Sequence, residues 1–158
     1  MSRARDLANL GDGITGADLP AGSVLQIVQG TTTTEVTSTT SSYIDTGLTA
    51  TITPSSASNK VLVIVTHGEI SKNADASARL AMRLVRGATT ISQFASGLAY
   101  INSAVTGRAS PSITYLDSPA TTSATTYKTT AANPDASGSI NIQNNSSMST
   151  ITLLEIAG

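Results

Sequence analysis

The chain has 158 residues, of which 25 are Thr, 22 are Ser and one is His, and its formal net charge at pH 7 is −1. This charge provides no basic surface for nucleic acid, and aromatic residues at 3% leave no platforms on which bases could stack. The absence of Cys excludes a disulfide framework and thiolate metal sites, and no apolar run approaches the ~18 residues of a membrane span. We therefore expect no nucleic acid partner and no membrane insertion.

The composition predicts a single all-β domain with a thin core. Threonine is β-branched and favours strands, whereas serine, glycine, asparagine and aspartate favour turns. Leu, Ile, Val and Phe total 34 residues, so little apolar surface is available for the interior. A net charge near zero argues against disorder, and the large apolar residues fall in short runs. Because a thin core gains stability when copies bury surface against one another, we expect an oligomer.

Residues 1–20 differ from the rest of the chain and predict an N-terminal anchoring arm. Ser2 can cap a short helix over residues 3–10, and Gly11 can end it. A helix of this length is marginal by itself, so its apolar side chains must be buried against another subunit or a larger assembly. The alternative is a frayed terminus. No apolar stretch follows the first charged residues, so a secretory signal is not expected. The residues expected to dock are Arg3, Arg5, Leu7, Leu10 and Ile14.

Residues 21–158 predict about ten short strands separated by turns, which is typical of an antiparallel β-sandwich or jelly roll. Lys60–Thr66 contains the continuous run Val-Leu-Val-Ile-Val and predicts a strand covered on both faces. The polar residues 31–42 predict either an exposed edge strand or a loop. The other strands are expected at residues 23–29, 48–53, 79–86, 89–94, 97–105, 112–116, 122–130, 139–143 and Ser149–Ile156.

Two arginines share one face of the strand expected at residues 79–86. Leucine and methionine occupy its other face, whereas Arg79 and Arg83 alternate with them. Such a face usually meets water, but arginine is enriched at interfaces between proteins. Arg79 and Arg83 are therefore candidates for a subunit seam, and an acidic sugar is a further alternative.

The sequence offers no recognisable catalytic constellation. His67 is the only histidine, and a Ser-His-Asp arrangement needs a base that a carboxylate orients beside a positioned nucleophile. A glycosidase needs two acids across a cleft, and nothing marks a pair among Glu35, Glu69 and Glu155. No nucleophile elbow, phosphate-binding glycine loop or zinc-protease helix motif occurs. We therefore expect no enzyme and no cofactor.

Two short acidic segments could supply oxygen ligands to calcium. They are Asp12 with Asp18, and Asn73 with Asp75. Neither follows the spacing of a dedicated calcium loop, and turns are rich in Asn and Asp for other reasons. We expect no metal site at either place.

Three segments, taken together, resemble β-sandwich virion proteins of tailed bacteriophages, especially those of marine and cyanobacterial phages. The first is TSSYIDTGLTATITP at residues 40–54, which leads into the apolar run ending at Val65. The second is RLVRG at residues 83–87, and the third is YLDSPATTSATTYK at residues 115–128 with the closing ITLLEI at residues 151–156. The resemblance covers roughly residues 22–158. It implies a jelly-roll sandwich of the tumour necrosis factor-like kind, which is usually a homotrimer.

Two tyrosines in the third segment are further candidates for a subunit seam. Residues 115–117 and 125–128 can pair as a hairpin around Ser118 and Pro119. Tyr115 and Tyr127 would then each present a flat apolar ring with a hydroxyl that needs a partner, which suits a sheet or a subunit interface.

The resemblance implies a structural role on the virion surface. A single sandwich behind a short arm suits a trimeric capsid decoration, or cement, protein whose partners are its own copies and the major capsid protein or other virion proteins. The alternative is a short tail-fibre or receptor-binding tip that touches a host surface glycan. A carbohydrate-binding, lectin-like module unrelated to virions is a third reading.

Overall fold

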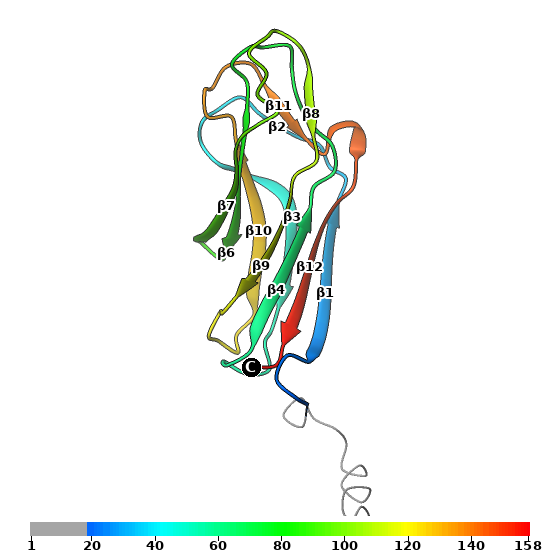
Figure 1. Ribbon diagram of the computed structural model, residues 1–158, viewed down its shortest axis with the longest axis vertical. Coiled ribbons are helices and arrows are strands. Elements are labelled where there is room, and N and C mark those ends of the chain that lie inside the picture. The colour runs from blue at the N-terminus through cyan, green and yellow to red at the C-terminus, as the bar shows by residue number, and fades with distance from the viewer. Residues whose placement is uncertain (1–18) are drawn as a thin grey trace, which may run out of the picture.

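The computed structural model describes residues 19–158, and Figure 1 shows an elongated, all-β molecule. Three antiparallel sheets of four strands each account for its regular structure, apart from one short 3₁₀ turn at Asn144–Ser146. The all-β sandwich expected from the sequence is therefore confirmed. Residues 1–18 lie outside the described residues, and with them the anchoring candidates Arg3, Arg5, Leu7, Leu10 and Ile14.

Two of the sheets face each other and form the sandwich (Figure 1). The first, here called the β4 sheet, has the order β1 (Val24–Thr32), β12 (Ser149–Ile156), β4 (Lys60–Thr66) and β9 (Ser112–Asp117). The second, the β10 sheet, has the order β3 (Ile44–Ile52), β10 (Thr125–Ala132), β6 (Leu80–Arg86) and β7 (Thr89–Leu98).

A smaller third sheet, here called the end sheet, lies at one end of the sandwich (Figure 1). It has the order β2 (Val36–Ser38), β11 (Ile140–Ile142), β5 (Ile70–Lys72) and β8 (Gly107–Ala109). The opposite end carries the start of β1 and residue 158 (Figure 1). The molecule therefore has two chemically different ends.

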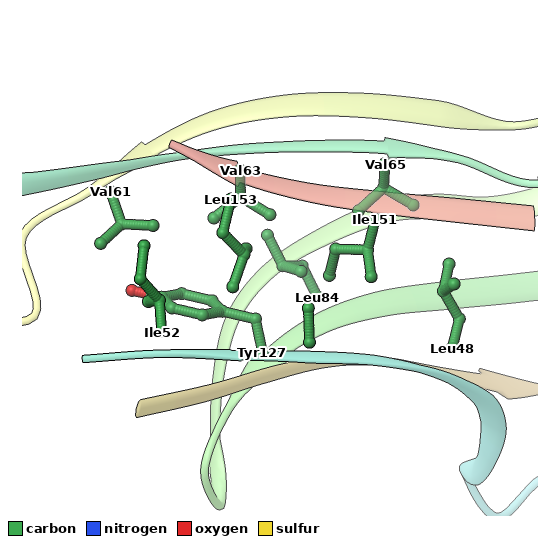
Figure 2. Packing of buried hydrophobic residues seen from close by; sticks show 10 residues of the cluster. Leu48, Ile52, Val61, Val63, Val65, Leu84, Tyr127, Ile151 and Leu153 are labelled. Atoms are coloured by element: carbon green, nitrogen blue, oxygen red, sulfur yellow. The ribbon is translucent and has the colours of Figure 1, made fainter. Parts of the chain in front are cut away.

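The main core lies between the β4 sheet and the β10 sheet. Because alternate residues of a strand point to opposite faces, one face of each sheet is apolar and turns inward. Figure 2 shows the two inward sets facing each other: Val61, Val63, Val65, Ile151 and Leu153 from one sheet, and Leu48, Ile52, Leu84 and Tyr127 from the other. A second cluster beneath the end sheet contains Ile70, Leu80, Met82, Ala131, Ile140 and Ile142.

The expectation that Lys60–Thr66 is covered on both faces is not met within one chain. Val61, Val63 and Val65 are fully buried, whereas Leu62 is half-buried and Ile64 is 38% exposed. The strand therefore alternates, because the β10 sheet covers only its inward face. The outward face carries aliphatic side chains that nothing in residues 19–158 covers completely.

The hairpin expected between residues 115–117 and 125–128 is wrong. β9 pairs with β4, whereas β10 pairs with β3 and β6, so the two segments lie in different sheets. The side chains of Asp117 and Tyr127 meet across the interior instead, with the Tyr127 hydroxyl donating to Asp117 Oδ2 at 2.6 Å. The turn expected around Ser118 and Pro119 belongs to a connection of residues 118–124, which joins two sheets rather than two neighbours in one sheet.

The strand expected at residues 97–105 is also wrong. β7 runs to Leu98, an irregular segment follows, and a strand resumes only at Gly107. The Lys72 ammonium binds the carbonyls of Ile101 and Ser103, which are therefore not available to a strand ladder. Of the polar residues 31–42, the first two extend β1, and β2 forms the edge of the end sheet.

We predict that Gly30→Ala destabilises the sandwich by about 3 kcal/mol or more, as overpacking in a close-packed interior does. A Cβ at Gly30 would lie 2.0 Å from the Thr49 carbonyl oxygen, where β1 of one sheet passes β3 of the other. Urea unfolding measures the effect. The control is Gly97→Ala, whose new methyl would lie no closer than 4.0 Å to its nearest neighbour, Arg79 Cδ. Equal stability of the two variants would contradict this account of the close approach.

Candidate functional site

His67 lies at the junction of the three sheets and is almost completely buried. Its Nε2 is 3.0 Å from the Thr129 hydroxyl of β10, and its Nδ1 is 3.2 Å from the Ser149 hydroxyl of β12. Thr129 in turn lies 2.6 Å from the Thr46 hydroxyl of β3. The ring stacks on Phe94 of β7, with 6.5 Å between the centroids. The histidine therefore joins the sheets through neutral hydroxyl groups.

This environment makes His67 a structural residue rather than a base. Burial lowers the pKa of His67 from 6.5 to about 4, so the imidazole is neutral near pH 7. Both ring nitrogens already have hydroxyl partners, and neither partner is a carboxylate that could orient the ring for proton transfer. The imidazole cannot reach a substrate without opening the junction of the sheets.

A second buried polar group ties the two large sheets together at the end away from the end sheet. Tyr127 of β10 donates its hydroxyl to Asp117 Oδ2 of β9, and Arg86 of β6 donates Nη1 to the same oxygen at 2.7 Å. Arg86 also reaches the Ser118 carbonyl at 3.3 Å. Burial raises the pKa of the Tyr127 hydroxyl, which therefore stays protonated and keeps donating.

The seam candidates are separated by this arrangement. Tyr127 is fully buried inside one chain, so its ring is not available to a neighbouring subunit. Tyr115 is half-buried and packs against the main core from β9. The expectation that Tyr127 belongs to a seam is therefore wrong, whereas a role in a seam stays a prediction for Tyr115.

Arg83 lies on β6 and Arg79 immediately precedes this strand, and each already has a partner within the chain. Arg79 forms an ion pair with Asp135, with 2.8 Å between Nε and Oδ2. Arg83 places its guanidinium 3.6 Å from the centroid of the Tyr43 ring. Both contacts leave the side chains partly exposed, so a role in a seam stays a prediction for these two residues.

Asn73 and Asp75 hold neighbouring loops together through hydrogen bonds, and these bonds already use their side-chain oxygens. The Asp75 carboxylate accepts hydrogen bonds from the Ser77 and Ala78 amides and from the Ser137 hydroxyl. Asn73 Oδ1 accepts the Ser139 amide at 3.0 Å. The Ser77 amide is the main reason why the pKa of Asp75 lies below its usual range. Within residues 19–158 no three His, Asp or Glu side chains gather as metal ligands, and Asp12 and Asp18 lie outside those residues.

The glutamates do not form an acid–base pair. Glu35 accepts a hydrogen bond from the backbone amide of Asn145 at 3.2 Å. Glu69 accepts one from the side-chain amide of Asn145 at 3.4 Å. Hydrogen bonds from Asn144 and Arg108 hold the pKa of Glu69 below its usual range, so it is not a proton donor near pH 7.

Glu155 lies far along the chain at the opposite end of the sandwich and is buried without a cation. Its carboxylate accepts hydrogen bonds from the Asn59 side chain at 2.6 Å, from Ser55 and from Gln26. Burial by itself would raise the pKa of Glu155, but these hydrogen bonds outweigh it and lower the pKa. The group fixes the loop before β4 against β1 and β12, which is a structural role.

One feature that the sequence reading missed is the buried lysine of the end sheet. Lys72 of β5 is completely buried, and its ammonium donates to the backbone carbonyls of Asp75, Ile101 and Ser103. It thereby orders the loop of residues 99–106, where Tyr100 and Val105 expose apolar surface. A lysine next to Asn in a turn-rich segment gave no signal of this, because two of the three acceptors, the carbonyls of Ile101 and Ser103, lie about thirty residues away.

A surface hollow on the β10 sheet is shallow. A cavity of about 160 Å³ lies on β3 and β10, beside Gly47, Thr49 and the ion pair of Asp45 with Lys128. Its charges neutralise each other at 2.8 Å, so the cavity offers no free charge to a ligand.

Comparison with known proteins leaves the chain without an assigned family: no family model and no curated protein matches it. Within residues 19–158 no helix has the length and apolar character needed to span a membrane.

We predict that stability falls as the pH drops from 6.5 to about 4, in part through His67. Its folded pKa lies below its unfolded value, so its contribution is complete above pH 6.5 and is lost as the imidazole becomes charged. The loss is on the order of 3 kcal/mol at most. Urea unfolding at both pH values, compared with His67→Gln, isolates this contribution because carboxylates titrate alike in both proteins. Identical pH dependence in the two proteins would show that His67 titrates normally.

We predict that Tyr127→Phe lowers the free energy of unfolding by about 1–3 kcal/mol, because it leaves the buried Asp117 carboxylate with one partner fewer. Tyr115→Phe is the matched control, since it removes a hydroxyl from a half-buried ring outside this group. Chemical denaturation of both variants checks the prediction. An equal loss of unfolding free energy in the two variants would show that the contact with Asp117 is not the cause.

Proposed function

We propose that this chain is a non-enzymatic structural protein of a bacteriophage virion. In this proposal it is a homotrimeric capsid decoration protein on the virion surface, and it attaches to the major capsid protein or another virion protein through residues 1–20. The proposal starts from the likeness of residues 22–158 to virion sandwich proteins. It is supported by what the described residues do with their polar groups.

The observation that carries the non-enzymatic part is the internal use of the reactive side chains. His67, Asp117 and Glu155 are buried, and each is held by groups that link different strands. Side chains of this kind serve catalysis only when they line an accessible cleft. Here they take the place of apolar core in a chain that has little of it, and they make the sandwich stiff.

The arrangement of the two ends supports attachment through the arm. Residues 19–23 join β1 at the end opposite the end sheet (Figure 1). The junction is fixed there, because Gly22 donates its amide to the Ala157 carbonyl at 2.8 Å and Ala157 donates to Ser23 at 2.9 Å. An arm that begins at this end would grip the shell, while the end sheet and its loops would point away from it.

A second candidate function, a receptor-binding tip, is favoured by the loop of residues 99–106. Three carbonyl contacts from Lys72 order its neighbourhood in advance, and it exposes Tyr100 and Ile101 at the end sheet. A preordered loop with an exposed aromatic ring loses little conformational entropy when it binds a partner. In this second proposal, the partner of the loop is a glycan on a host surface.

We predict that deleting residues 1–20 leaves a folded oligomer that no longer attaches to virions. The apolar side chains at Leu7, Leu10 and Ile14 would each contribute about 1.5–3 kcal/mol when buried in the shell. Co-sedimentation with particles that lack the protein measures attachment, and circular dichroism confirms folding. The matched variant is full-length Tyr100→Ser/Ile101→Ser, which should attach normally. Full occupancy by the truncated protein would refute attachment through the arm, whereas loss of host binding in the loop variant would favour the tip.

A further inference from the structure

A continuous aliphatic row crosses the outer face of the β4 sheet. Ile27 of β1 lies opposite Leu154 of β12, Leu154 lies opposite Leu62 of β4, and Leu62 lies opposite Leu116 of β9. Residues that are directly opposite in neighbouring strands share a face, with side chains about 5 Å apart. These four side chains therefore form one row that spans every strand of the sheet, here called the outer row.

The outer row faces away from the core. Its neighbours along the strands, Val61, Val63 and Leu153, are fully buried against the β10 sheet, so the alternate residues point outward. Ile27 is 63% exposed and Leu116 is 50% exposed, although both are large aliphatic side chains. A single exposed leucine is ordinary on a protein surface, but a row of four across a whole sheet is not.

The surroundings of the outer row extend it and add almost no charge. Ile64 lies beside it on β4, and Val24 pairs with Ile156 at the end of the sheet. The remaining outward positions of the β4 sheet are Gln29, Thr31, Thr150, Thr152, Thr66, Ser112, Thr114 and Lys60, so Lys60 is the one charged residue described on this face.

The outer face of the β10 sheet is different. It carries the ion pair of Asp45 with Lys128, the ion pair of Arg79 with Asp135, and Arg83 stacked on Tyr43. Paired charges of this kind are well solvated and need no cover. Of the two outer faces, only the face of the β4 sheet therefore has the chemistry of a surface that is buried in use.

We infer that the outer row packs against a second copy of this chain and forms the subunit interface of the proposed homotrimer. Around a three-fold axis the equivalent faces of the three copies converge, so charges of one sign near the axis would repel one another. This face avoids that cost, because its single charge, Lys60, lies at the margin next to Ile156. The contact also covers the second face of Lys60–Thr66, whose five consecutive aliphatic residues predict burial on both sides.

This inference takes only the number of subunits, three, from the proposed function. Another occupant of the face would be residues 1–18 of the same chain, since β1 starts beside the outer row and the segment contains Leu7, Leu10 and Ile14. In that case the protein would be a monomer whose face is covered from within. The experiment separates the two by measuring mass and accessibility together.

The first measurement is the mass of Ile27→Glu/Leu116→Glu in solution. Light scattering should give a multiple of 16.0 kDa for the natural sequence, three times that value in a trimer, and a single 16.0 kDa for the variant. The matched control is Thr89→Glu/Gln93→Glu, which adds the same two charges at exposed positions of β7 in the other sheet and should keep the oligomer. Circular dichroism verifies that each variant is folded.

The second measurement uses the absence of cysteine from the chain, which makes a single introduced thiol a clean probe. In the oligomer, Ile64→Cys should react with a thiol reagent at no more than roughly one tenth of the rate that it shows in the Ile27→Glu/Leu116→Glu background. Gln93→Cys, on exposed β7, should react equally fast in both. This readout stays informative even if the double glutamate variant folds poorly, because Ile64→Cys can then be compared with Gln93→Cys in the otherwise natural chain.

Three outcomes would overturn the inference: a monomeric natural protein, an oligomer that survives both glutamates, or a freely reactive Ile64→Cys in the oligomer. A monomer with a protected Ile64→Cys would assign the face to residues 1–18 instead. None of these results depends on virions. Failure of particle attachment would therefore refute the proposed virion role and leave the interface standing. A monomeric natural protein would refute the interface and the homotrimer, and attachment through residues 1–20 would stay a separate question.

Discussion

The contact between the inward faces of the β4 and β10 sheets is the constraint on which the rest of this molecule depends. Its apolar part is small, because the valines of β4 and the aliphatic residues of β12 meet only a few large partners, with Tyr127 the largest. Close approach makes up for this. Gly30 lets β1 pass so near to β3 that even a methyl group would overlap the Thr49 carbonyl. A sandwich of this kind tolerates little change at the places where the sheets touch.

Buried polar groups complete what the apolar core leaves open. The group of Tyr127, Asp117 and Arg86 closes one end of the sandwich, His67 and the hydroxyl of Thr129 join the sheets at the other, and Glu155 fixes the edge near the start of β1. Each of these side chains forms hydrogen bonds with neighbours from other strands. These bonds offset the cost of removing the polar groups from water and favour one arrangement of the strands. The same arrangement supports the proposal that the chain is not an enzyme, since His67, Asp117 and Glu155 are enclosed and hydrogen-bonded.

The two outer faces of the sandwich differ from each other, and so do its two ends. One outer face is charged and paired within the chain, whereas the other presents the outer row. One end carries residues 19–23 and the start of β1, and the other carries the end sheet with the loop that Lys72 orders. An assembly protein needs this division, because contacts with copies, with the support and with the outside must not compete for one surface. The proposed decoration role and the inferred interface use different parts of it.

The sequence by itself determined the fold class and the limits of the best strands. Lys60–Thr66 and Ser149–Ile156 were placed correctly because their residues alternate or run continuously over a whole strand, and periodicity is a local property. Tertiary structure decided which strands pair, and so it separated Tyr115 from Tyr127 and replaced the strand expected at residues 97–105 by a loop. It also decided that His67 and Lys72 are buried and that the outer row exists at all. Those features depend on partners far away in the chain, and composition and spacing carry no record of which distant segments will meet.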